Sequence, residues 1–143
     1  MTVVIKRVYE EPSPQDGARV LVDRLWPRGL TKEAAALDAW LRDLAPSNEL
    51  RKWIHSHPQQ WSKFREKYLK ELASETANQA LQQLYEIAKR NRRLTLLYAA
   101  KDKEHNNAAV LKQLLDGERK PPTGTGPIRA ASARRARASQ RRP

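Results

Sequence analysis

The sequence contains no cysteine. Disulfides, a thiolate nucleophile and thiolate metal sites are therefore excluded, which fits a reducing cytoplasm. No apolar run approaches the roughly 18 residues that a membrane span needs. The first residues also lack the basic region and long apolar core of a signal peptide. We therefore expect a cytoplasmic chain that has no membrane partner.

Acidic residues are absent from 119–143, although this segment holds eight of the 28 basic residues. Residues 1–118 keep 20 basic and 16 acidic residues, a net charge of +4 against +12 for the whole chain. Proline and glycine are frequent in 121–127, and Arg, Ala and Ser dominate 129–143. We predict a folded domain over 1–118, then a linker and a disordered basic tail over 119–143.

Several short apolar runs predict the strands of a parallel sheet. Residues 18–25 and 94–100 carry consecutive apolar positions, which favours burial on both faces of a sheet. Residues 3–9 are rich in β-branched side chains and predict another strand. Residues 37–44 fit either a continued helix or a strand, and their alternating apolar positions favour the strand.

Helices are predicted near 32–36, from 48 to the stop at 56–58, across 58–72, over 76–90 and over 106–116. Thr31 and Ser47 are suited to cap two of them. Thr76 begins a capping-box spacing, and Pro58 suits a first helical turn. Gly117 suits a left-handed stop. The predicted fold class is α/β, with a small central, mostly parallel sheet flanked by helices.

Four motifs follow one another in a recognisable order: VDRLWPRG (22–29), WLRDLAPS (40–47), LRKWIHSHPQQW..F...Y..EL (50–72) and LTLLYAAKDKEHNNA..L (94–111). Together they resemble the YeaO-like branch of the domain-of-unknown-function 488 family. The resemblance spans about residues 3–116 and leaves out the basic tail. It implies a compact α/β domain with a parallel sheet, and a strand at 37–44. No established activity comes with it.

Longer relatives in that family carry a cysteine and a Cys-His-Arg element near the last strand. The corresponding regions here are Tyr98-Ala99-Ala100 and His105-Asn106-Asn107. The resemblance therefore implies that any thiol chemistry of those relatives is absent from this chain.

Polar side chains follow the two central predicted strands. If these strands are neighbours, the loops at their carboxyl ends meet, and ligands of α/β sheets usually bind there. The predicted catalytic residues, for acid–base work, are Asp23, Asp102 and His105. The predicted ligand-binding residues are Arg24, Trp26, Arg28, Lys101, Asn106 and Asn107.

Each residue type has a chemical reason to be in this set. Arginine forks bind phosphate or carboxylate, and Asp102 or His105 could act as a general base. Asp23 and Asp102 could hold Mg²⁺ with a phosphate, although no metal site is predicted. In the alternative interpretation Asp23 and Arg24 pair with each other or cap neighbouring elements, and Trp26 belongs to the core.

Other motifs carry less chemistry. His55 and His57 lie two apart and have no third ligand nearby, so we expect them at a cap or on the surface. The sequence has no glycine-rich phosphate loop, and Gly29 alone is too little. The cofactor, if any, is therefore unknown.

The leading hypothesis is a domain that binds, and could transform, a small anionic or nucleotide-like ligand at the loops after 20–25 and 94–100. The alternative is non-specific binding to nucleic acid through the basic residues of 119–143. Whether the domain is an enzyme is left open.

Overall fold

The computed structural model describes residues 2–117. Its four strands are β1 Thr2–Arg7, β2 Ala18–Leu21, β3 Ala39–Trp40 and β4 Arg93–Tyr98. They form one sheet in the order β1-β4-β2-β3, and every neighbouring pair is parallel. The predicted α/β class is confirmed for the described residues. The tail predicted over 119–143 lies outside them.

The described helices are α1 Lys32–Ala35, α2 Asn48–Ser56, α3 Trp61–Leu72, α4 Glu75–Arg90 and α5 Asn107–Gly117. Short 3₁₀ turns cover Pro14–Asp16 and Arg42–Leu44. None of the helices within residues 2–117 is long and apolar enough to cross a bilayer.

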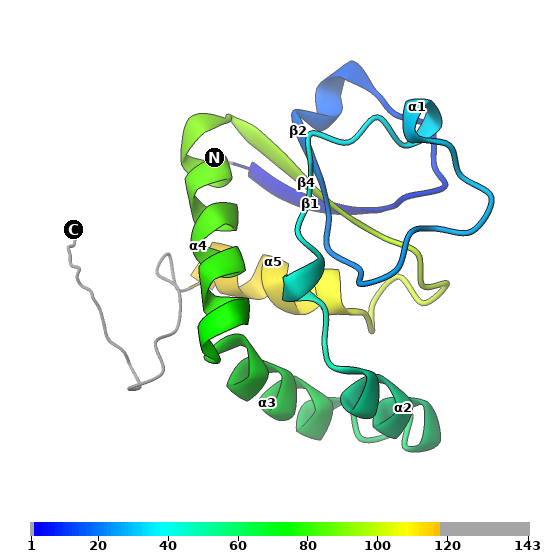
Figure 1. Ribbon diagram of the computed structural model, residues 1–143, viewed down its shortest axis with the longest axis vertical. Helices are drawn as coiled ribbons and strands as arrows, with labels where there is room; N and C mark the ends of the chain where they lie inside the picture. Colours follow the sequence, from blue (N-terminus) through cyan, green and yellow to red (C-terminus); the bar gives the residue numbers. More distant parts are fainter. Residues whose placement is uncertain (1, 118–143) are drawn as a thin grey trace.

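The two faces of the sheet are covered differently, because successive side chains of a strand point to opposite faces. Val20 and Leu96 belong to a large core that includes buried residues of α2 to α5. Leu21 and Leu97 belong to a small cluster, which packs against the connection between β2 and β3. Figure 1 shows α4 and α5 on one side of the strands. The short helix α1, which lies in the connection between β2 and β3, is well away from both of these helices.

All four predicted strands are shorter in the structure, and β2 and β3 lose the most residues. β2 ends at Leu21, and the chain bends at Arg24 and Leu25; just before this bend the Asp23 carboxylate, in place of a backbone carbonyl, accepts the Ala99 N–H. The strand interpretation of 37–44 is confirmed, but β3 keeps only residues 39–40. Its partner β2 has ended by then, and the chain tightens into the second 3₁₀ turn.

Two predicted helix caps are confirmed. The Thr31 hydroxyl accepts the Ala34 N–H at 3.1 Å, and the Ser47 hydroxyl accepts the Leu50 N–H at 3.1 Å. Ser47 also donates its backbone N–H and its hydroxyl to the Glu71 carboxylate. The cap therefore ties the start of α2 to the end of α3.

Three predicted helix boundaries are wrong. Thr76 lies inside α4, because Ser74 has the extended backbone of the capping position. Pro58 lies in a turn before α3, which begins only at Trp61. Gly117 is the last residue of α5 rather than a left-handed stop after it.

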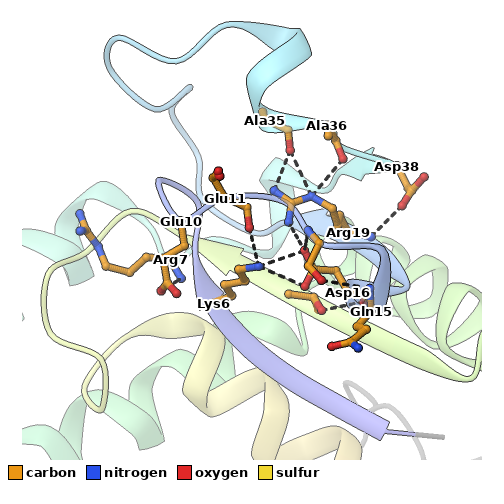
Figure 2. A network of polar contacts seen from close by, with 12 residues as sticks. Lys6, Arg7, Glu10, Glu11, Gln15, Asp16, Arg19, Ala35, Ala36 and Asp38 are labelled. Atoms are coloured by element: carbon orange, nitrogen blue, oxygen red, sulfur yellow. Dashed lines mark hydrogen bonds and ion pairs between the residues drawn. The ribbon is translucent and has the colours of Figure 1, made fainter.

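A buried polar network fixes the β2–β3 connection to the sheet (Figure 2). Asp16 and Arg19 are only 6% and 4% exposed, and they form an ion pair. The Arg19 guanidinium also donates to the carbonyls of Ala35 at 2.8 Å and Ala36 at 3.1 Å. Lys6 donates to the Asp16 carboxylate at 3.1 Å. One arginine on a central strand therefore holds the end of α1.

Asp16 is held in its ionised form by these partners. Burial raises its pKa, but the Ser13 N–H, Lys6 and Arg19 outweigh burial, so the pKa of Asp16 is lowered overall. A carboxyl whose pKa is lower in the folded state adds stability above its unfolded pKa, about 3.9. That stability is lost as the pH falls through the folded pKa.

We predict that Asp16→Asn lowers the free energy of unfolding by roughly 3 kcal/mol at pH 7, because it breaks a buried ion pair. The difference in unfolding free energy between Asp16→Asn and the native protein should begin to narrow as the pH falls below about 4, where the carboxyl of the unfolded chain takes up a proton, and should vanish only below the lowered pKa of the folded state. Urea unfolding between pH 3 and 7 measures this, with the exposed Asp43→Asn as control. If the unfolding free energies of the native protein and Asp16→Asn change in parallel between pH 3 and 7, the charge of Asp16 does not stabilise the fold.

Candidate functional site

A cavity of about 690 Å³ lies at the carboxyl edge of the sheet. All nine predicted site residues line it: Asp23, Arg24, Trp26, Arg28, Lys101, Asp102, His105, Asn106 and Asn107. They come from the loops after β2 and β4 and from the start of α5. The parallel pairing of β2 with β4 explains why residues some 80 positions apart in the chain meet here.

Asp23 lies where β2, β4 and α5 meet. Its Oδ2 atom accepts the Ala99 N–H at 2.9 Å. The Asn107 side chain also hydrogen-bonds to Asp23, and its Nδ2 donates to the Val22 carbonyl at 2.8 Å. These contacts fix the carboxylate in the cavity wall.

Burial raises the pKa of Asp23. The hydrogen bonds from Ala99 and Asn107 and the charge of Arg51 lower it, but burial outweighs them. Within residues 2–117, Asp23 forms no ion pair. The cavity wall therefore contains a carboxylate whose charge is only partly compensated by the protein.

Arg24 and Trp26 serve the loop that follows β2. The Arg24 guanidinium donates to the carbonyl of Ala45, the residue that ends the second 3₁₀ turn, at 3.1 Å. Of the two possibilities in the alternative interpretation, pairing with Asp23 is therefore wrong for Arg24, and capping of a neighbouring element is confirmed. Trp26 donates its indole N–H to the Leu30 carbonyl at 2.6 Å. Its ring meets that of Trp40 edge-on, with centroids 5.4 Å apart. Trp26 therefore both lines the cavity and belongs to the small apolar cluster.

Arg28 and Lys101 lie at the exposed rim of the cavity. The Tyr9 hydroxyl donates to the Arg28 carbonyl at 3.0 Å and so ties the end of β1 to this loop. Neither Arg28 nor Lys101 forms an ion pair with another described residue. Their charges are therefore available to an anion.

The loop before α5 is largely committed to its own hydrogen bonds. Asp102 accepts the N–H groups of Glu104 and His105, both at 2.9 Å, and these two bonds lower its pKa. The His105 Nδ1 lies 3.3 Å from the same carboxylate. Asn106 caps α5 by accepting the Ala109 N–H, and it donates to the Asp102 carbonyl. Asp102 and Asn106 thus shape the loop.

The opposite wall comes from α2 and α3 and was not predicted from the sequence. Arg51, Ile54 and His55 of α2 line the cavity, followed by Trp61 and Phe64 of α3. Arg51 and His55 are four residues apart, so they share one face of a helix. This spacing is the signal in the sequence that places His55, expected at a cap or on the surface, beside Arg51 in the wall of the cavity.

Two further features bear on chemistry. The Trp61 ring lies 5.0 Å from the His105 ring between centroids, which makes an aromatic corner of the cavity. Among residues 2–117 there is no group of three or more His, Cys, Asp or Glu side chains arranged to hold a metal ion.

The described residues thus form an α/β domain with a parallel sheet and a cavity at the carboxyl edge of that sheet. The chain belongs to the DUF488-N3i family, described as the inactive DUF488-N3 subclade, whose profile matches residues 2–131. The predicted family is thereby confirmed.

Two relatives are similar over 115 residues, which is 80% of this chain. The uncharacterized protein YeaO of Escherichia coli (strain K12) is 47% identical, and the match covers 97% of its length. The uncharacterized protein Rv3073c of Mycobacterium tuberculosis (strain H37Rv) is 41% identical over 94% of its length. No solved structure matches this chain.

We predict that Asp23→Asn is more stable than the native protein at pH 7. A carboxyl whose pKa is raised on folding costs stability once the pH exceeds its unfolded value, and the amide removes that cost. The asparagine oxygen can still accept the Ala99 N–H. Urea midpoints should differ at pH 7 and converge below about pH 4, where the unfolded carboxyl is also protonated.

The matched change Asp23→Ala removes the acceptor as well as the charge. It should lower the midpoint at every pH, because the Ala99 N–H loses its partner. If Asp23→Asn is as damaging as Asp23→Ala at pH 7, the charge of Asp23 stabilises the fold and this account of it is wrong.

Proposed function

We propose that this domain binds a small anionic or nucleotide-like ligand in the cavity at the carboxyl edge of its sheet. The observation that carries the proposal is the charge of the cavity lining. Four cations, Arg24, Arg28, Arg51 and Lys101, face two carboxylates, and Asp102 is engaged by its own loop. The balance favours a ligand with negative charge.

The cations differ in how freely they can reach a ligand. Arg24 is partly engaged by the Ala45 carbonyl, and Arg51 donates to Asn48 at 3.1 Å. Arg28 and Lys101 make no ion pair within residues 2–117. An arginine fork binds phosphate or carboxylate through two parallel hydrogen bonds, so Arg28 and Arg51 are the proposed anchors.

Binding without turnover is the proposed mode. The general-base candidates predicted from the sequence have structural partners: Asp102 holds its own loop, and His105 lies against Asp102 and Trp61. The family description names an inactive subclade, which supports the same conclusion. Asp23, also predicted to be catalytic, is proposed instead as a polar contact for the ligand.

The test is thermal unfolding of the full chain with inorganic phosphate, mononucleotides, phosphorylated sugars and dicarboxylates at about 0.15 M salt. A ligand at about a hundred times its dissociation constant adds roughly 2.7 kcal/mol of stability. We predict that one of these ligand classes raises the unfolding midpoint by several degrees. Arg28→Ala and Arg51→Ala should each weaken the affinity for that ligand about tenfold.

Arg92→Ala is the control, because Arg92 is an exposed arginine just before β4, at the amino edge of the sheet. It should leave binding unchanged. The proposal would be contradicted if none of these ligands raised the unfolding midpoint, or if Arg51→Ala and Arg92→Ala weakened ligand binding equally.

A second candidate function follows from the eight basic residues and no acidic residue in 119–143. Such a segment can bind nucleic acid by neutralising phosphates, and this binding weakens steeply as the salt concentration rises. A ligand held by hydrogen bonds inside the cavity is screened less. Salt dependence therefore separates the two functions.

A further inference from the structure

Asp23 has more capacity to accept hydrogen bonds than the protein uses. A carboxylate offers about four lone-pair sites. Two protein groups engage it, the Ala99 N–H and the Asn107 side chain, and these come from the end of β4 and the start of α5. Because Asp23 also lines the cavity, the remaining sites are available to a ligand.

No cation within residues 2–117 pairs with this carboxylate. Arg24, its neighbour in sequence, turns to the Ala45 carbonyl instead. Arg51 acts on Asp23 only through its charge and forms no ion pair with it. A ligand that brought only negative charge would be repelled here, so the ligand must also bring hydrogen-bond donors.

The shape of the cavity favours a planar group. Trp61 and His105 form an aromatic corner, and Phe64 stacks behind Trp61 with centroids 4.7 Å apart. Flat aromatic surfaces bind nucleobases by stacking. The cavity volume of about 690 Å³ is far larger than a phosphate needs and suits a ligand of nucleotide size.

We propose that the ligand is a guanine nucleotide, free or as an unpaired residue of a single strand, whose base donates to Asp23. This inference rests on the proposed function and adds the identity of the base. Guanine carries two adjacent donors, its N1–H and its 2-amino group, which match the two oxygens of a carboxylate. Hypoxanthine lacks the amino group, and adenine has an acceptor at N1.

The test is calorimetric titration of the full chain with GMP, IMP and AMP at pH 7 and about 0.15 M salt. GMP should bind at least about tenfold more tightly than IMP, because IMP leaves one acceptor of Asp23 unpaired. AMP should bind more weakly still. In Asp23→Asn the advantage of GMP over IMP should fall below about twofold.

Asp43→Asn is the matched control, because Asp43 is an exposed carboxylate that does not line the cavity. It should keep the full preference for GMP. Short single strands with one central guanine or one central inosine identify the source of the base. The inference is supported if guanine is preferred over hypoxanthine, as free nucleotides or in single strands, and if Asp23→Asn removes this preference. Whichever of the two, free GMP or the guanine-containing strand, binds more tightly identifies the source of the base.

Three results would overturn it. Equal binding of GMP, IMP and AMP that Arg51→Ala weakens would refute the base assignment and leave the proposed function standing. Binding of a zwitterion such as aspartate or glutamate, without any nucleotide, would refute it in the same way if Arg51→Ala weakens that binding. No binding of nucleotides, amino acids or inorganic phosphate would contradict both proposals.

Discussion

The ion pair between Asp16 and Arg19 is the interaction on which the arrangement of this domain depends. One face of the sheet is covered by α4 and α5, and its core continues to α2 and α3, but the other face has only a small apolar cluster. Arg19, on the central strand β2, reaches across that face to the carbonyls of Ala35 and Ala36. Removing one partner of a buried pair costs about 3–5 kcal/mol. The β2–β3 connection is therefore held by polar contacts as much as by packing.

This dependence extends to the cavity, because the same connection forms one of its walls. Trp26 packs against Trp40 and lines the cavity, and Arg28 is tied to Tyr9. The other wall, from α2 and α3, belongs to the large core. Asp23 lies between them with a pKa raised by burial. A fold that keeps such a carboxyl gives up stability for it, which is typical of functional sites.

The sequence predicted the parallel sheet, because consecutive apolar residues in 18–25 and 94–100 require burial on both faces. It also predicted one wall of the cavity, since polar residues after neighbouring parallel strands must meet. It could not predict Arg51, His55 and Trp61, whose approach depends on how α2 and α3 pack. Nor could it show that Asp102 serves its own loop, because that depends on backbone geometry. The helix starts predicted at Pro58 and Thr76 were wrong, because the sequence pattern does not fix the residue at which the preceding turn ends.

Amide hydrogen exchange of Arg19→Met and Arg19→Lys at pH 7 tests the central claim most directly. Methionine keeps the apolar stem of Arg19 but removes its donors, and lysine keeps the charge without the fork. The account predicts faster exchange across 22–38 in both variants, more in Arg19→Met, while β4 amides stay protected. Unchanged exchange across 22–38, or an equal rise throughout residues 2–117, would show that the Asp16–Arg19 pair does not hold this wall of the cavity.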